Sequence, residues 1–212
     1  MAMDDNAGGT SEGTRDTYRL EAFSDGVIAI AITLLIIEIR VPQGVESATE
    51  MWAALRDLWP NYLGYALSFA IIGIMWANHH AIFRLISRVD HYVILGNLFF
   101  LLCLAFIPFP TALMTETLGH SDERVGIVVY SGWFLVTALS YNLLWRYAAS
   151  RAHSLMPGVA PRAIQSISSR FRLGPPAYAV AFALSFVSTW ASLGLLLRLA
   201  LTYVLPYNAS AD

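Results

Sequence analysis

Long apolar stretches dominate the chain, and most are close to the length that crosses a lipid bilayer. A helix needs about 20 apolar residues to span the hydrocarbon core. The last stretch is longer, and we divide it into two short helices that turn near Ser188–Ser192. The runs do not alternate, as membrane strands would. We therefore predict an all-α integral membrane protein with six transmembrane helices. The stretches are about Ala22–Ile39, Pro60–Phe83, Tyr92–Met114, Val125–Tyr147 and Leu173–Tyr207.

Composition agrees with this pattern. The chain is 57% hydrophobic and 13% charged, whereas soluble domains are about 25% charged. Residues 1–17 are polar, Gly-rich and acidic, so we predict a disordered tail there. Residues 18–208 form one predicted six-helix transmembrane domain, and residues 209–212 a C-terminal tail. Cys103 is the only cysteine, which excludes an internal disulfide.

The arginines indicate how the chain is oriented, since it contains no lysine. With a cytoplasmic N-terminus, the inner side carries most of the arginines, as the positive-inside rule requires. Acidic residues collect in the predicted outer loops, where they are either ordinary solvated charges or an acidic mouth that attracts cations. The inner arginines are Arg15, Arg19, Arg84, Arg88, Arg146, Arg151, Arg162, Arg170 and Arg172, and the outer ones Arg40, Arg56 and Arg124.

The first apolar helix has two different faces. At 100° per residue, Phe23, Leu34 and Ile37 lie within about 40° of Ile30, and Arg19 shares their side. Thr33 flanks this apolar face. Ser24 and Asp25 point elsewhere. The simplest interpretation is a lipid-facing or core stripe on one side and a bundle-locking Ser–Asp pair on the other.

Asp25 is costly in an apolar helix, about 2.5–3.5 kcal/mol at the bilayer centre and less near the interface. It is therefore either paired inside the bundle or part of a working site. Arg19 lies at the cytoplasmic end, where it can snorkel or pair. The candidate hydrogen-bond partners of Ser24 and Asp25 are Trp76, Asn78, His79, His80 and Asn97.

The histidines allow several roles. His79 and His80 are adjacent, so they do not share a helix face, whereas a helical metal site usually takes an i, i+4 pair. Interfacial or network histidines are favoured over a metal site or a proton sensor. Asp90 precedes the third span and is suited to capping it. Arg198 lies inside the last span, where we expect it to snorkel. We see no catalytic triad, nucleotide loop or cysteine cluster, and expect neither an enzyme nor a cofactor or metal.

Arg19-x-x-x-Phe23-Ser24-Asp25 at the start of a first transmembrane helix resembles the signature of the transmembrane protein 175 family of potassium channels. Two further segments are similar to that family: Trp76-Ala-Asn78-His79-His80-Ala-Ile-Phe83, and Asn97-Leu-Phe-Phe with Pro108-Phe-Pro110-Thr111. The similarity covers roughly Arg19–Met114.

The resemblance implies a homotetramer whose pore is lined by four copies of the first helix. In the family, the residue five past the motif aspartate forms the narrow apolar constriction, here Ile30. Leu34 and Ile37 match further apolar rings. The hydroxyl eight past the aspartate, linked with potassium preference, is Thr33.

A ring of isoleucines offers no oxygen ligands, so an ion passes partly hydrated, and a narrow apolar ring can also gate by dewetting. The chain has no Thr-Val-Gly-Tyr-Gly filter, so we expect modest selectivity. The leading hypothesis is a K⁺-permeable channel of the bacterial plasma membrane with both termini in the cytoplasm. The alternatives are a secondary or proton-coupled transporter using Asp25, Arg19 and the histidines as a relay, and a membrane enzyme or metal carrier built on His79 and His80.

Overall fold

The structure is a computed structural model that describes residues 6–204, and over these residues it contains only helices. The long elements are α1 (Asn6–Leu34), which continues into the 3₁₀ turn η1 (Leu35–Glu38), α3 (Trp59–Phe83) and α6 (Glu123–Ser150). The pair α4 (His91–Ala105) and α5 (Pro108–Thr117) follows α3. The shorter helices are α2 (Ala48–Asp57), α7 (Ala152–Leu155), α8 (Pro161–Phe171), α9 (Gly174–Ser185) and α10 (Thr189–Val204).

Four segments are long and apolar enough to cross a membrane, and they correspond to the first four predicted spans. They are Arg15–Glu38, Trp59–Phe83, His91–Thr117 and Glu123–Ser150. The last predicted stretch divides into α9 and α10, as expected. The turn lies at Phe186–Ser188, slightly earlier than predicted. The end of this stretch and the predicted tail at residues 209–212 lie outside the described residues.

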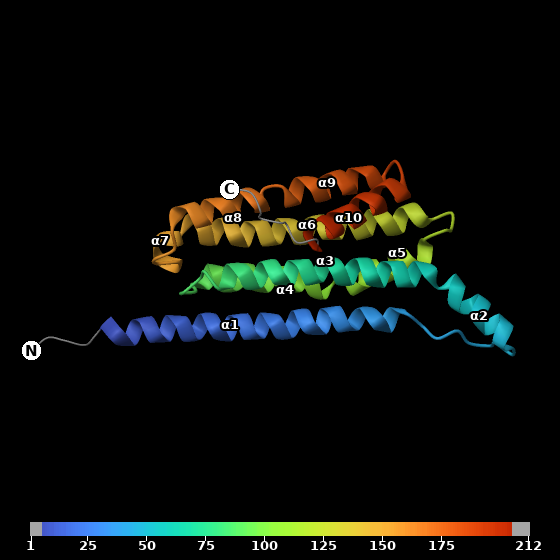
Figure 1. Ribbon diagram of the computed structural model, residues 1–212, viewed down its shortest axis with the longest axis horizontal. Coiled ribbons are helices and arrows are strands. Elements are labelled where there is room, and N and C mark those ends of the chain that lie inside the picture. The colour runs from blue at the N-terminus through green and yellow to red at the C-terminus, as the bar shows by residue number, and fades with distance from the viewer. Residues whose placement is uncertain (1–5, 205–212) are drawn as a thin grey trace, which may run out of the picture.

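The helices run side by side, with α1 along one edge of the bundle (Figure 1). α1 packs against α3 and α4, while α6 lies between α4 and α5 on one side and α9 on the other. Only 22% of the most apolar stretch of α1 is buried, against 56% for α6. A broad side of α1 is therefore left uncovered by its own subunit.

Three parts of the chain are more helical than predicted. One is the predicted inner loop between Tyr147 and Leu173, which contains α7 and α8. α1 already begins at Asn6, inside the tail predicted to be disordered, because adding residues to a formed helix costs little compared with starting one. α2 was predicted as loop. Ser47 Oγ accepts a hydrogen bond from Glu50 N at 3.2 Å, and Glu50 Oε2 accepts one from Glu46 N at 3.1 Å. This arrangement resembles a capping box, whose S-x-x-E signature is present in the sequence.

The predicted helix over Tyr92–Met114 is broken before Pro108. Proline has no N–H and clashes with the preceding turn, so the helix tightens and Ile107 N donates to Leu104 O at 3.1 Å. The Cys103 carbonyl thereby loses its helical donor. Trp133 Nε1 of α6 donates to it instead, at 2.8 Å. The break between α4 and α5 is thus tied to α6.

Close contacts make α3, α5 and α6 one packed unit. A Cβ on Gly126 would lie 2.9 Å from Met114 Cα and 3.0 Å from Leu113 O, so only glycine lets α6 approach α5 this closely. The buried Ser68 hydroxyl is hydrogen-bonded to both Thr111 Oγ1 and Tyr130 Oη, at 2.9 Å each. α1 rests on α3 of this unit and on the neighbouring α4.

Asp90 joins the start of α4 to the end of α6. Its Oδ1 accepts from Val93 N at 2.8 Å, as the predicted cap requires, and its Oδ2 accepts from Tyr147 Oη at 2.6 Å. Burial alone disfavours the charged carboxyl, but the hydrogen bonds from Tyr147 and from the Val93 and Tyr92 N–H groups outweigh it. The pKa of Asp90 consequently lies below its ordinary value.

Asp90→Ala should destabilise the protein by about 1–2 kcal/mol at pH 7, since it removes a helix cap and a hydrogen bond to Tyr147. A lowered pKa in the folded state gives stability above the unfolded pKa, about 4, that is lost as pH falls through the folded value. The difference from wild type should therefore shrink in acid. Thermal unfolding at pH 7 and at pH 3 measures this difference in stability, with the exposed Asp57→Ala as control. A difference that persists unchanged at pH 3 would contradict this role.

Candidate functional site

The uncovered side of α1 carries the apolar residues that the sequence placed on one face. Their exposed fractions are large for apolar side chains: 60% for Ile30, 40% for Leu34, 64% for Ile37 and 53% for Phe23. Arg19 is exposed as well. The buried face of the same helix consists of Thr17, Ser24, Ile28, Ala31 and Leu35. Within one subunit these apolar residues are therefore free to face lipid or another subunit.

The end of α1 is tightened and fixed. In the 3₁₀ turn η1, residues three apart lie directly above one another, so Ile37 is aligned with Leu34 more closely than on an ideal α-helix. Asn61 Nδ2 of α3 donates to Glu38 O at 3.3 Å. The exposed Thr33 hydroxyl donates to Ile30 O at 2.9 Å. Its lone pairs point away from that bond and remain able to face an ion.

On the opposite face, a chain of buried hydrogen bonds connects three helices. His79 Nε2 of α3 is 2.8 Å from Asn97 Oδ1, Asn97 Nδ2 of α4 is 2.8 Å from Ser24 Oγ, and Ser24 Oγ is 2.7 Å from Leu20 O. His79, Asn97 and Ser24 are fully buried. Since a carbonyl oxygen only accepts, donation runs in one direction, from His79 through Asn97 and Ser24 to the backbone of α1.

His79 is held by its ring as well as by its nitrogen. It stacks on Phe83 with ring centres 4.2 Å apart and on Phe100 at 5.7 Å. Its Nδ1 has no hydrogen-bond partner among the described residues. This atom is buried, and the ring stacks on two aromatic side chains, so the geometry favours a structural imidazole over a ligand of a metal ion.

A second pair of contacts between α1 and α3 lies beside this chain of hydrogen bonds. Trp76 Nε1 donates to Asp25 Oδ1 at 2.9 Å, and His80 Nδ1 lies 2.9 Å from Glu21 Oε1. Trp76 and His80 stack with ring centres 6.0 Å apart. Glu21 and Asp25 are one helical turn apart on α1, and Trp76 and His80 are one turn apart on α3. Two helix surfaces are thus joined at two successive levels.

Most of the predicted polar residues come together, with one exception. Ser24, Asp25, Trp76, His79, His80 and Asn97 all take part in these contacts. Asn78 does not: it lines a small cavity near Tyr141 and Phe171, on the other side of α3. Asn78 is two residues past Trp76, and therefore about 200° away on the helix.

Sequence reasoning missed Glu21 as a network member. Its signal was its position one turn before Asp25, which puts both carboxylates on one face of α1.

Comparison with known proteins identifies the relatives of this chain. The family model of the endosomal/lysosomal potassium channel TMEM175 matches residues 19–108. A potassium channel of Chamaesiphon minutus is 46% identical over 195 residues, which are 92% of this chain and 96% of the relative. The chain belongs to the TMEM175 family. A potassium channel of Streptomyces collinus is 41% identical over 185 residues, 85% of this chain and 89% of the relative.

The fold of a solved TMEM175 relative is the same. A crystal structure of a lysosomal potassium-selective channel TMEM175 homologue from Chamaesiphon minutus superposes with a TM-score of 0.82 at 45% identity, covering 92% of this chain and all of the other. The TMEM175 match at residues 19–108 includes α1 from Arg19 onward, α3 and α4. The exposed apolar residues of α1 and every contact of the polar network lie within it.

We expect Asp25→Ala to weaken assembly and stability, because Trp76 Nε1 would lose its acceptor. A hydrogen bond to a charged group contributes about 1.5–3 kcal/mol when shielded and less when exposed. Trp76→Phe removes only the donor and is the matched variant. If the two residues act through this bond, the double variant should lose little more than either single one in thermal unfolding, and the fraction of assembled protein on size exclusion should follow. Fully additive losses would show that Asp25 acts elsewhere.

Proposed function

We propose that this protein is a potassium channel of a bacterial plasma membrane, formed by four subunits of six transmembrane helices, with α1 lining the pore. The observation that carries the proposal is the division of α1 into two faces. The polar face is bonded to α3 and α4, and the apolar face is left exposed by its own subunit. Relatives named as potassium channels cover most of the chain.

The six-helix count adds α9 and α10 to the four long segments. α10 holds an apolar stretch over Thr189–Thr202, and at 1.5 Å per residue its 16 residues are about 24 Å long. That is shorter than the hydrocarbon core of about 30 Å. Packing on α9, α3 and α6 supports it as the last helix of the bundle.

In the proposed pore, Ile30 forms the narrowest ring, with Leu34 and Ile37 as further rings. Such a ring presents methyl groups and no oxygens, so passing ions keep part of their water. Potassium gives up water more easily than sodium, which yields a preference without a carbonyl cage. Thr33 would add hydroxyl oxygens beside this ring.

A proton-coupled transporter remains the second candidate, and the geometry supports it less. A relay needs groups that gain and lose protons along the transport path. Asp25 and Glu21 instead contact Trp76 and His80 of α3, on the side of α1 away from Ile30. Arg19 is exposed and takes no part in those contacts. A carrier would show saturable, coupled transport that depends on Asp25 titration.

The orientation proposed here puts both termini in the cytoplasm. The bundle end formed by α7, α8 and the α3–α4 loop is rich in arginines. The end formed by α2 carries the acidic residues Glu46, Glu50, Asp57, Glu116, Asp122 and Glu123. This distribution follows the positive-inside rule when the α7–α8 end is cytoplasmic.

A flux assay with purified protein in liposomes tests the channel. Potassium flux should exceed sodium flux, and N-methylglucamine should not pass. Ile30→Asn should raise conductance and reduce the preference for potassium, because an amide hydrates the apolar ring. Ile36→Asn is the matched control, since Ile36 is equally exposed but lies about 120° from Ile30. If Ile30→Asn changes neither property while variants of Leu34 or Ile37 do, Ile30 is not the constriction.

Thr33→Val keeps the shape of the side chain and removes its hydroxyl. If Thr33 contributes oxygens to a partly dehydrated ion, the reversal potential under potassium/sodium bi-ionic conditions should shift toward zero in an intact tetramer. An unchanged reversal potential would mean that Thr33 only bonds Ile30 O. Selectivity would then come from the size of the apolar ring.

A further inference from the structure

The last two fifths of the chain are strongly unbalanced in charge. From Val125 to Ala211 they contain no aspartate or glutamate. Their six arginines are all exposed: Arg146, Arg151, Arg162, Arg170, Arg172 and Arg198. Among the side chains that the structure describes, those of residues 15–202, the only contact with the geometry of an ion pair joins His80 to Glu21. Arg151 lies over the Tyr147 ring and near Asp90, but the others have no such acid beside them.

Two hydrogen bonds fix the position of Arg170 and Arg172 along α6. Trp145 Nε1 donates to Ser168 Oγ at 3.0 Å, and Asn142 Nδ2 donates to Phe171 O at 2.8 Å. The two pairs define one antiparallel register between α6 and the α8 segment. In that register Arg172 is level with Tyr141, and Arg170 is level with Leu143.

The same register relates the arginines to the membrane. A hydrocarbon core of about 30 Å corresponds to about 20 helical residues, and counting from Val125 places its far boundary near Trp145. Arg146 then lies at that boundary. Arg170 and Arg172 lie roughly 3–6 Å inside it. An unpaired arginine at this depth is costly, and snorkelling toward phosphate relieves the cost.

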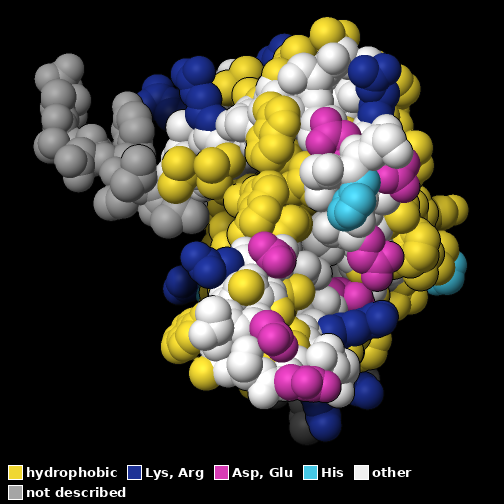
Figure 2. Space-filling model, turned by 90° about the vertical axis from the view of Figure 1, so that its right-hand side faces the viewer, with side chains coloured by type: hydrophobic (Ala, Val, Ile, Leu, Met, Phe, Trp, Pro, Cys, Tyr) yellow, Lys and Arg dark blue, Asp and Glu magenta, His cyan; other side chains and the backbone are white. Residues whose placement is uncertain are grey.

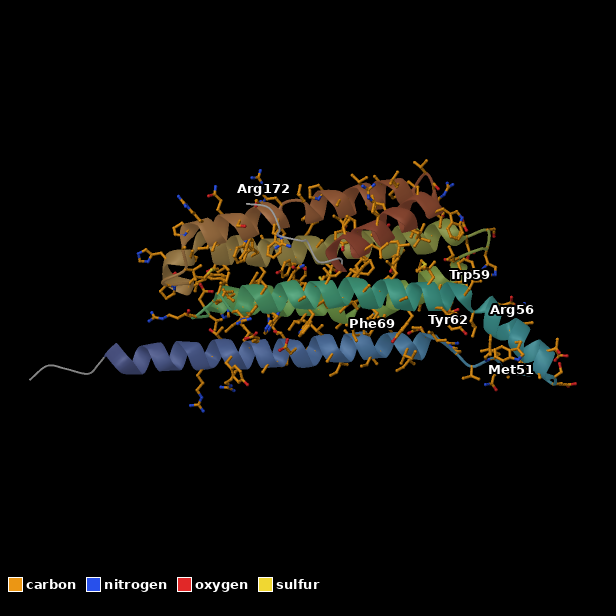
Figure 3. The ribbon with its side chains drawn as sticks, in the orientation of Figure 1. Met51, Arg56, Trp59, Tyr62, Phe69 and Arg172 are labelled. Atoms are coloured by element: carbon orange, nitrogen blue, oxygen red, sulfur yellow. The ribbon has the colours of Figure 1, made fainter. Side chains whose placement is uncertain are left out.

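The joint between α8 and α9 presents these charges to the outside of the bundle. Pro175 and Pro176 follow Gly174, and the helix is interrupted at Arg172–Leu173. Leu173, next to Arg172, is an exposed apolar side chain. Figure 3 shows Arg172 on the side of the bundle away from α1. An arginine beside an exposed leucine at this level suits a headgroup and its acyl chain.

We propose that Arg146, Arg170 and Arg172 bind the phosphates of anionic lipid headgroups in the leaflet at the α7–α8 end. This is the cytoplasmic leaflet in the orientation proposed above. The opposite end does not suit such lipids. Acidic side chains gather there (Figure 2), and the sequence places Glu46, Glu50, Asp57, Glu116, Asp122 and Glu123 in its loops and short helices.

The test measures lipid binding to the purified protein, independently of ion flux. Phosphatidylglycerol is titrated into the detergent-solubilised protein, and bound lipid is counted by native mass spectrometry. Phosphatidylcholine serves as the neutral lipid. Each arginine contributes about fivefold in affinity, so Arg170→Gln with Arg172→Gln should weaken phosphatidylglycerol binding roughly 30-fold. The control pair Arg40→Gln and Arg56→Gln, at the α2 end, should leave binding unchanged.

Three results would overturn the proposal. The first is equal binding of phosphatidylglycerol and phosphatidylcholine. The second is phosphatidylglycerol binding by the Arg170/Arg172 glutamine variant that equals wild type. The third is a loss of phosphatidylglycerol binding in the Arg40/Arg56 control pair as large as in the Arg170/Arg172 variant. Inorganic phosphate that displaced the lipid at millimolar concentration would instead indicate a site for free phosphate. The variant's melting temperature in phosphatidylcholine shows whether it is folded. Arg170→Lys with Arg172→Lys keeps the charge and should retain most of the binding, which keeps the proposal testable if the glutamine variant is unstable.

Discussion

The buried hydrogen-bond chain from His79 through Asn97 to Ser24 is the constraint on which the position of α1 depends. Each member lies in apolar surroundings and is satisfied by the others. Moving α1 by one residue would turn Ser24 about 100° out of reach and leave buried polar groups unpaired, at about 1–3 kcal/mol each. Because Ser24 must face α4, Ile30 and Ile37 must face away from the bundle. The orientation of the apolar face is thus decided on the polar side of the helix.

The two faces of α1 could be predicted from the sequence because helical periodicity alone determines which residues share a side. The partners of the polar face could not be predicted, because periodicity does not say which neighbouring helix lies opposite. Asn78 was included for its polarity although it points about 200° away from Trp76. Glu21 was overlooked as a partner although it lies one turn from Asp25.

Helix boundaries followed local chemistry that a hydropathy pattern does not contain. The pattern merges α4 and α5 because both are apolar, whereas the missing N–H of Pro108 separates them and Trp133 occupies the freed carbonyl. The hydropathy pattern does not predict α2, whose start is stabilised by hydrogen bonds to the side chains of Ser47 and Glu50. The positions of α9 and α10 were predicted closely, since the turn between them interrupts an apolar run of known total length.

The bond from Asn61 to the Glu38 carbonyl has a mechanical consequence. α1 is held near Asp25 by Trp76 and again at Glu38 by Asn61, with about 20 Å of helix between these points. Between these two points Ile30 and Leu34 lie on the uncovered side of α1, while Ile28, Ala31 and Leu35 on the opposite side are buried against the bundle. Sliding the helix along its axis would break both hydrogen bonds at once. Any displacement of Ile30 relative to α3 must therefore come from bending of α1 between the two bonds. The exposed Gly26, with no neighbouring atom within 4 Å of its Cβ position, lies at the start of this segment, where the lack of a side chain lowers the cost of bending.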